Sequence, residues 1–192
     1  SDEEERQRQG YDIATTVRFD ETGSDLRVDR LNLHDADGDI AHVAYAPTAT
    51  IMRVNLGWRR RQHKEVHGFN IEVSSGKWVR ENVDDEGEDA RGSVERIAPY
   101  VEDRKNALLF TPKETLSHSD VATLQYALKR AVQQRFQLED SELAAEALPE
   151  SGNRRVILLY ESAEGGAGVL IRLGTDPALF RSVAATALQV CH

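Results

Sequence analysis

The chain has 192 residues, of which 40% are hydrophobic and 30% are charged, and its formal net charge is −9. This length and apolar content allow a hydrophobic core without disulfides or structural metals. The acidic balance argues against a protein that coats nucleic acid non-specifically, because phosphate binding depends on many Lys and Arg side chains, but it permits a local basic surface.

The sequence also bears on the compartment of the protein. No apolar run reaches the roughly 18 residues of a membrane span, and the acidic start is unlike a signal peptide. The single cysteine, Cys191, suits a reducing compartment, so we expect a cytoplasmic protein with no membrane partner. The chain stops directly after an apolar pattern, so we also expect a fragment of a larger protein.

Six segments in the first hundred residues have the period-two pattern or β-branched content of strands. They are residues 11–19, 26–33, 40–46, 48–56, 66–73 and 77–80. We expect the first two segments to form a hairpin. Pro47 separates the middle two, because proline cannot donate to a strand ladder. An acidic loop at 84–89 follows, and residues 94–101 are ambiguous. These patterns predict a β-rich lobe over residues 1–105.

The period changes in the second half. Residues 106–110 predict a strand that Pro112 closes. Apolar residues at three- and four-residue steps then predict an amphipathic helix over 119–137, with Ser117 or Ser119 as its N-cap. Residues 141–148 fit a strand somewhat better than a short helix. Thr175-Asp176-Pro177 then begins a second amphipathic helix, which continues to Cys191. We therefore expect an α/β lobe over residues 106–192, in an α+β chain of two lobes or one continuous domain.

A glycine corner lies inside this second lobe. Val156–Tyr160 has five consecutive apolar residues, as in a strand buried on both faces, and Gly165, Gly166 and Gly168 follow before a new apolar segment. Backbone N–H groups at such a corner can bind phosphate. However, Glu161 and Glu164 would repel an anion, and no lysine follows. A packing or conformational role is the favoured interpretation of the three glycines.

One dense basic run interrupts the acidic chain. Trp58, Arg59, Arg60, Arg61 and Lys64 lie within seven residues. Arginines grip a phosphate backbone while an indole stacks on a base, so this run predicts a nucleic-acid contact. A charged hairpin that pairs with the acidic loop at 84–89 explains the run equally well.

Metal-binding patterns are weak. Asp35–Asp39 has its glycine at the wrong place for an EF-hand, and His63 and His67 lack the order of a zinc protease, so an acidic turn and a surface pair are favoured. Cys191 and His192 could be metal ligands, but structural zinc needs four, so the chain alone holds no cofactor. No Walker A motif or catalytic triad is present, and the residues predict a non-catalytic binding module.

Three segments together resemble a known family: Leu124–Leu128, Ile157–Leu170 with its glycine corner, and the helix end Ala187–His192. They are similar to the MrfA-type zinc-binding domain of superfamily 2 helicase-related proteins, found in mitomycin-repair helicases and in the phage-defence systems DISARM and Druantia. Ser1–Tyr11 and Arg53–Arg60 are similar to segments upstream of it.

The resemblance implies a module that supports DNA handling by an ATP-driven motor in DNA repair or antiviral defence. It implies a four-cysteine zinc cluster in the parent protein, with Cys191 matching the first ligand, and a structural role for Gly165, Gly166 and Gly168. We therefore expect an accessory domain that contacts DNA or helicase motor domains. The alternative is a protein–protein interaction module that docks a partner subunit, and a third hypothesis is a small-molecule site at the glycine corner.

Overall fold

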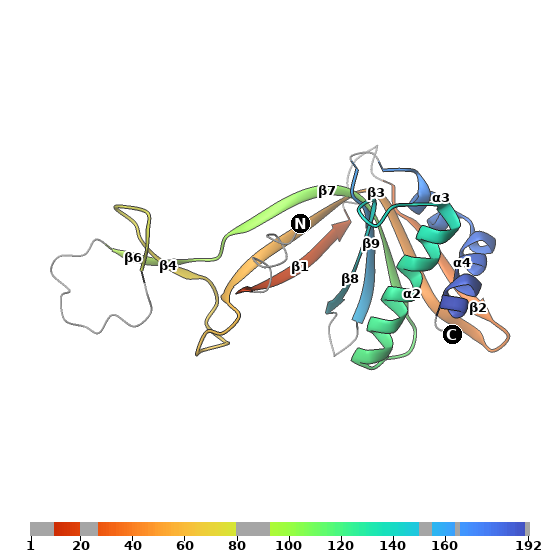
Figure 1. Ribbon diagram of the computed structural model, residues 1–192, viewed down its shortest axis with the longest axis horizontal. Helices are drawn as coiled ribbons and strands as arrows, with labels where there is room; N and C mark the ends of the chain where they lie inside the picture. Colours follow the sequence, from red (N-terminus) through yellow and green to blue (C-terminus); the bar gives the residue numbers. More distant parts are fainter. Residues whose placement is uncertain (1–9, 20–26, 80–92, 150–154, 164–165, 191–192) are drawn as a thin grey trace. The chain divides into compact units, whose positions relative to one another are not determined.

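The computed structural model describes residues 10–19, 27–79, 93–149, 155–163 and 166–190 (Figure 1). These residues form a mixed α+β fold with a β-rich N-terminal part, so the predicted fold class is confirmed. The strands are β1 (Tyr11–Phe19), β2 (Asp29–Asp35), β3 (Gly38–Trp58), β4 (Phe69–Glu72), β5 (Lys77–Val79), β6 (Val94–Ile97), β7 (Tyr100–Pro112), β8 (Leu143–Pro149) and β9 (Arg155–Glu161). The helices in this part of the chain are α2 (His118–Phe136), α3 (Val169–Thr175) and α4 (Pro177–Val190).

The chain divides into two compact units that alternate along the sequence. Unit 1 comprises Ser1–Thr16 and Met52–Glu102, and unit 2 comprises Val17–Ile51 and Asp103–His192. The expected lobes at residues 1–105 and 106–192 stay a prediction. Residues 17–51, in contrast, join the unit that carries the helices. Alternation within a strand does not reveal which strand it will pair with. The pattern of residues 17–51 therefore could not show that they belong with the helices.

The larger sheet has the strand order β1-β3-β7-β9-β8, with β2 also paired to β3. The expected hairpin between 11–19 and 26–33 is wrong, because β2 pairs antiparallel with β3, from Asp29 opposite Tyr45 to Asp35 opposite Gly38. The acidic segment at 35–39 is the turn of this hairpin. Asp35 Oδ1 accepts the backbone N–H of Asp37 at 2.8 Å, which fixes the turn.

Strand β3 is continuous through Pro47, whereas two strands were expected there. Before the proline, Val43 and Tyr45 face the core that the helices cover, and after it Ala49 and Ile51 face a second core on the other side. Residues of the same parity thus change sides near Pro47, as a one-residue irregularity in a strand requires. Pro47 lies two residues after Tyr45, the last β3 residue that pairs with β2, so the N–H group that proline lacks is not needed for that ladder.

Helices cover one face of the sheet in unit 2. Ile157 and Leu159 of β9 belong to the core cluster that also contains buried residues of α2, α3 and α4, including Leu128, Leu173 and Phe180. Val156 and Leu158 point to the opposite face and belong to the second cluster. Among the described residues, that cluster consists of strand and loop side chains. β9 is therefore buried on both faces, as predicted. It is antiparallel to both β7 and β8.

The predicted helix boundaries agree with the capping geometry. The Ser117 hydroxyl accepts the N–H of Asp120 at 3.2 Å at the start of α2. Asp176 Oδ1 accepts the N–H groups of Ala178 and Leu179 at 2.9 and 3.0 Å at the start of α4. Each bond satisfies an N–H group that would have no partner within its helix. The strand predicted at 141–148 is confirmed as β8.

Candidate functional site

Two glycines set the geometry of unit 1, where β5, β4 and β6 form a three-stranded antiparallel sheet. Gly68 N donates to Leu56 O at 3.0 Å, immediately before β4. Gly68 has φ of +87°, and a Cβ there would lie 2.2 Å from the carbonyl oxygen of Ile97. A Cβ on Gly57 would lie 3.1 Å from Gly68 O. This close backbone approach requires glycine and places the end of β3 beside the start of β4.

Four aromatic side chains from β1, β3, β4 and β5 meet in unit 1, and we refer to Tyr11, Trp58, Phe69 and Trp78 as the aromatic row. Tyr11 and Trp58 are stacked with ring centroids 4.6 Å apart. Phe69 forms edge-to-face pairs with Tyr11, Trp58 and Trp78, with ring centroids 6.0, 6.1 and 5.0 Å apart. These distances are within the range of attractive aromatic pairs.

The two tryptophans of the row are exposed. Trp58 is 55% exposed and Trp78 is 62% exposed. Trp78 lies opposite Ile71 in the β4–β5 ladder, so it shares a face of the small sheet with Ile71 and Phe69. An indole that is packed at one ring edge or face and open to solvent elsewhere can bind a further planar group.

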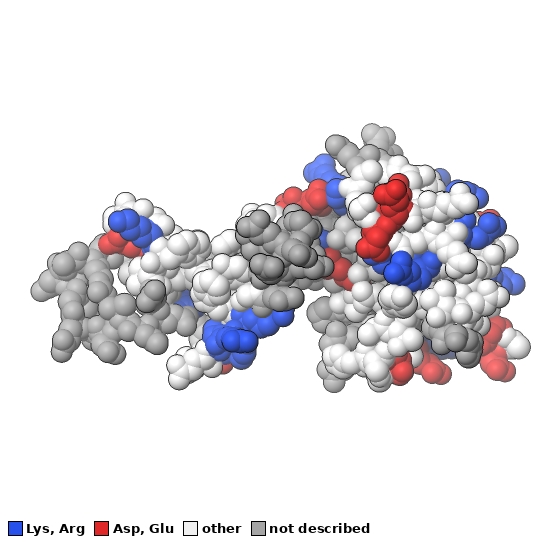
Figure 2. Space-filling view, in the orientation of Figure 1, with Lys and Arg blue, Asp and Glu red and all other residues white. Residues whose placement is uncertain are grey.

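The basic turn, defined here as Arg59–Lys64, follows Trp58 directly, and Lys and Arg side chains gather over this part of the surface (Figure 2). Arg59, Arg60 and Lys64 are exposed. Lys64 Nζ also donates to the carbonyl oxygen of Arg59, which closes the turn.

Arg61 differs from the other four predicted contact residues, because its side chain is 4% exposed. Its guanidinium donates to Asp12 Oδ2 at 2.8 Å, to Trp58 O at 3.1 Å and to Lys64 O at 2.8 Å. Arg61 is thus occupied inside unit 1, and its burial does not favour the predicted contact with nucleic acid. It holds the basic turn against β1 and β3 instead.

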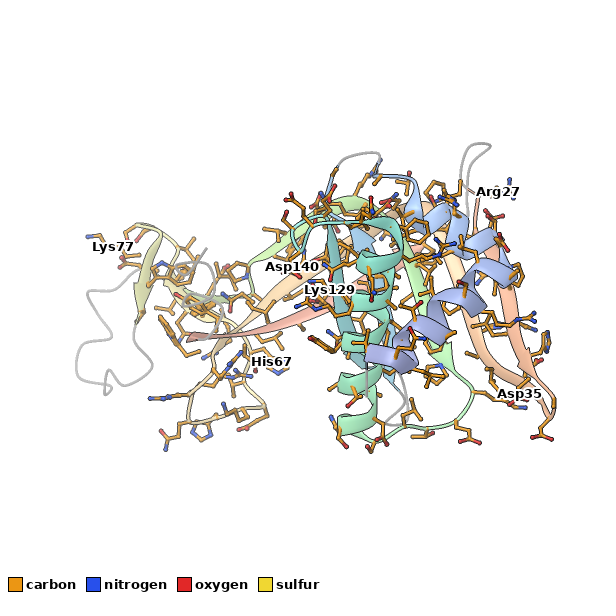
Figure 3. The ribbon with its side chains drawn as sticks, turned by 45° about the vertical axis from the view of Figure 1, so that its right-hand side comes forward. Arg27, Asp35, His67, Lys77, Lys129 and Asp140 are labelled. Carbon is orange, nitrogen blue, oxygen red and sulfur yellow. The ribbon has the colours of Figure 1, made fainter. Side chains whose placement is uncertain are left out.

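Histidine and acidic side chains lie within and directly after the basic turn. A backbone hydrogen bond of its own and the neighbouring His63 lower the pKa of Glu65, so this carboxylate stays charged. His63 Nδ1 lies 3.3 Å from Glu65 Oε1, and His67 is an exposed residue before β4 (Figure 3). The acidic loop at 84–89, the suggested partner of the basic run, lies outside the described residues.

The glycine corner in unit 2 surrounds a buried carboxylate. Glu161, at the end of β9, is 1% exposed. Its Oε1 accepts the N–H groups of Val169 and Leu170 at 2.8 and 3.4 Å, and its Oε2 accepts a hydrogen bond from Asn106 Nδ2. The first N–H groups of α3, which could have bound a phosphate, are therefore bound by the protein itself.

The glycines of this corner allow the backbone to approach that carboxylate. Gly166 has φ of +68°, and a Cβ there would lie 2.0 Å from Glu161 Oε2 and 2.1 Å from Asn106 Nδ2. Gly168 has φ of +74° at the N-cap of α3. Gly165 lies outside the described residues. The positions of Gly166 and Gly168 favour the predicted structural role, which remains a prediction.

Tyr45 adjoins the same buried group. It is 3% exposed, and burial, together with the charge of Glu161, raises the pKa of Tyr45 above its ordinary value. The Oδ1 atom of Asn106 is buried without a hydrogen-bond partner in the part of the chain that the structure describes. The corner is therefore a largely closed polar cluster, which gives little support to a small-molecule site there.

A shallow pocket of about 410 Å³ lies elsewhere in unit 2, along α2 and beside the end of α4. Lys129 and Asp140, which lie near one another in Figure 3, form an ion pair of 2.9 Å at this place. Hydrogen bonds from Lys129 and Gln133 lower the pKa of Asp140. Tyr126 and Arg130 also line the pocket, with the guanidinium 5.5 Å from the ring centroid.

No metal site is present among residues 10–19, 27–79, 93–149, 155–163 and 166–190, because no three His, Cys, Asp or Glu side chains there come together as ligands. The described residues therefore do not fit a zinc ion. Cys191, the predicted possible ligand, lies outside them. In the same part of the chain, no helix is both long and apolar enough to cross a bilayer.

Sequence patterns missed three members of the aromatic row. Tyr11, Phe69 and Trp78 belong to separate segments, each of which has an ordinary strand pattern. The one available clue to Trp78 was the rarity of tryptophan, because the chain has only two. Their proximity depends on the Gly57–Gly68 approach and on the β4–β5 register, which are nonlocal features.

Comparison with protein families gives one match. Residues 124–192 match the family described as the MrfA Zn-binding domain. The resemblance predicted from the sequence is confirmed over these residues, which include most of α2, the glycine corner and α4. Unit 1 lies outside the matched range.

Comparison with solved structures gives a weaker likeness. The crystal structure of DUF1998 helicase MrfA bound to DNA aligns with 93% of this chain at 11% identity, with a TM-score of 0.49. The alignment covers 20% of that helicase, so the present chain spans about a fifth of its length. A comparison with curated proteins found no match.

Proposed function

We propose that this chain is a non-catalytic accessory domain of a cytoplasmic helicase-related protein and that unit 1 contacts DNA through Trp58, Arg59, Arg60 and Lys64. The family match of residues 124–192 supports the helicase-associated role. The observation that carries the DNA contact is the exposure of two arginines directly after an exposed tryptophan, on a turn that buried Arg61 holds in place.

Arginine and lysine side chains bind phosphates, and a rigid turn reduces the entropy lost when they do so. The net charge of −9 makes the basic turn a local exception, so binding would be confined to this surface. Motor domains of the parent protein would bind ATP and translocate, in DNA repair or in antiviral defence. Zinc in the parent would need Cys191 together with ligands that the described residues do not offer.

The test is a salt titration of DNA binding by fluorescence anisotropy with the Arg59→Ala/Arg60→Ala double variant. Loss of two phosphate contacts should reduce the magnitude of the slope of log K against log salt by about 1.4–1.8. An Arg135→Ala/Arg181→Ala variant removes the same charge from exposed helix positions in unit 2, and it should bind as the parent chain does. Equal slopes for both variants would exclude the basic turn as the contact.

A second candidate function is docking of a protein partner. Unit 1 exposes further apolar side chains outside the aromatic row, including Tyr100 and Val101, which are 62% and 63% exposed. Such exposed groups are common at protein interfaces. A Tyr100→Ser/Val101→Ser variant should then lose co-purification with the motor domains or a partner subunit while its DNA affinity stays unchanged. Unchanged co-purification would argue against docking at this surface.

A further inference from the structure

We infer that the aromatic row of unit 1 is a stacking platform for unpaired bases, so that the nucleic acid bound there is single-stranded. This inference rests on the proposed DNA contact and names its substrate class. It depends on Tyr11, Trp58, Phe69 and Trp78, three of which play no part in the proposal based on the basic turn.

The row is built as a surface feature and not as part of a core. None of its four members belongs to either cluster of buried apolar residues. Each ring contacts the next one along the row. The ring centroids are 4.6 Å apart for Tyr11 and Trp58, 6.1 Å for Trp58 and Phe69, and 5.0 Å for Phe69 and Trp78. Mutual packing holds the rings in fixed orientations while both indoles stay more than half exposed. Pre-oriented rings lose little conformational freedom when a planar ligand stacks on them.

The chemistry beside the row selects nucleic acid over a purely apolar ligand. Arg59 and Arg60 follow Trp58 without a gap, so a base stacked on this indole would have its phosphates within reach of exposed guanidinium groups. A basic track together with aromatic rings is the usual arrangement for binding single strands without strict sequence preference.

Unpaired bases fit this arrangement better than a duplex does. Bases within a duplex already stack on each other and do not present their faces, whereas single-stranded bases can be splayed apart. A duplex could contact the arginines through its phosphates, but it would leave the indoles exposed. The behaviour of the two tryptophans therefore distinguishes the two substrates.

Intrinsic fluorescence gives a direct test, because the chain has only two tryptophans and both belong to the row. The full chain is titrated with a twelve-nucleotide oligothymidine and with a twelve-base-pair duplex, and binding is measured in parallel by anisotropy of a labelled strand. Stacking should quench the fluorescence with the single strand and leave it nearly unchanged with the duplex. Trp58→Ala and Trp78→Ala should each weaken single-strand binding by roughly 5- to 100-fold.

Two further variants separate stacking from folding. Trp58→Phe keeps an aromatic face and should retain most of the affinity, whereas Tyr126→Ala removes a ring of unit 2 that is 57% exposed and should have no effect. Equal binding of both polymers without quenching, or undiminished single-strand binding by the two alanine variants, would overturn the stacking platform while the DNA contact stands. Absence of binding to either polymer would overturn both.

Discussion

Replacement of Glu161 is expected to destabilise unit 2 strongly, because this carboxylate joins β9, β7 and α3. It is 1% exposed and accepts hydrogen bonds from the N–H groups of Val169 and Leu170 and from Asn106 Nδ2. Glu161→Ala would remove all three acceptor contacts. The backbone N–H groups belong to residues that are 5% and 0% exposed, so water cannot readily replace the carboxylate.

The size of the effect follows from the number of donors left without a partner. Each buried unsatisfied donor costs about 1–3 kcal/mol. Removal of a buried charge returns part of its desolvation cost, which offsets some of this loss. The free energy of unfolding should therefore fall by about 2–4 kcal/mol, equivalent to a decrease in the melting temperature of about 4–15 °C for a chain of this size.

Glu161→Gln is the matched control, because it keeps the shape of the side chain and one acceptor oxygen for α3. Its new amide would meet the Nδ2 donor of Asn106. Asn106 Oδ1 has no partner among the described residues, so rotation of the Asn106 amide can supply an acceptor. We expect a loss of only about 1 kcal/mol, the difference between a charge-assisted and a neutral hydrogen bond.

Urea denaturation followed by far-UV circular dichroism measures both variants against the parent chain. The acceptor role predicts a clear order, with the parent most stable, Glu161→Gln next and Glu161→Ala least stable. If Glu161→Gln were as unstable as Glu161→Ala, the negative charge and not the acceptor geometry would hold the corner. If neither variant lost stability, the bonds to α3 would contribute nothing and the reasoning would fail.

Two further outcomes are expected. Gly68→Ala should destabilise unit 1 by about 3 kcal/mol or more, because its Cβ would clash with the carbonyl oxygen of Ile97. The control is Gly76→Ala, which has φ of +67° but open space around it. It should cost only about 1–2 kcal/mol in the same urea titration. The raised pKa of Tyr45 means that the unfolded chain loses this phenol proton first, so stability should fall as pH rises above about 10, and Tyr45→Phe should reduce that fall. Absorbance titration should also show a lower pKa of Tyr45 in the Glu161→Gln variant.

Local sequence patterns were sufficient to predict several helices and strands of this protein. The apolar run Val156–Tyr160 gave a strand buried on both faces, and the capping residues Ser117 and Asp176 marked the starts of α2 and α4. These features depend on neighbours within a few residues, so periodicity and capping chemistry are sufficient to predict them. The segments that carried the family resemblance belong to this same C-terminal region.

The pairing of segments became known only from the folded structure. That structure paired β2 with β3, buried Arg61 while its neighbours Arg59 and Arg60 stayed exposed, and assembled the aromatic row from four strands. The structure also shows that Glu161, which was expected to repel anions, itself accepts hydrogen bonds from the first N–H groups of α3. The contact of Arg61 with Asp12, the aromatic row and the bond between Asn106 and Glu161 join residues far apart in the chain, and no local pattern encodes their geometry. Close backbone approaches at Gly68 and Gly166 lie beside the last two.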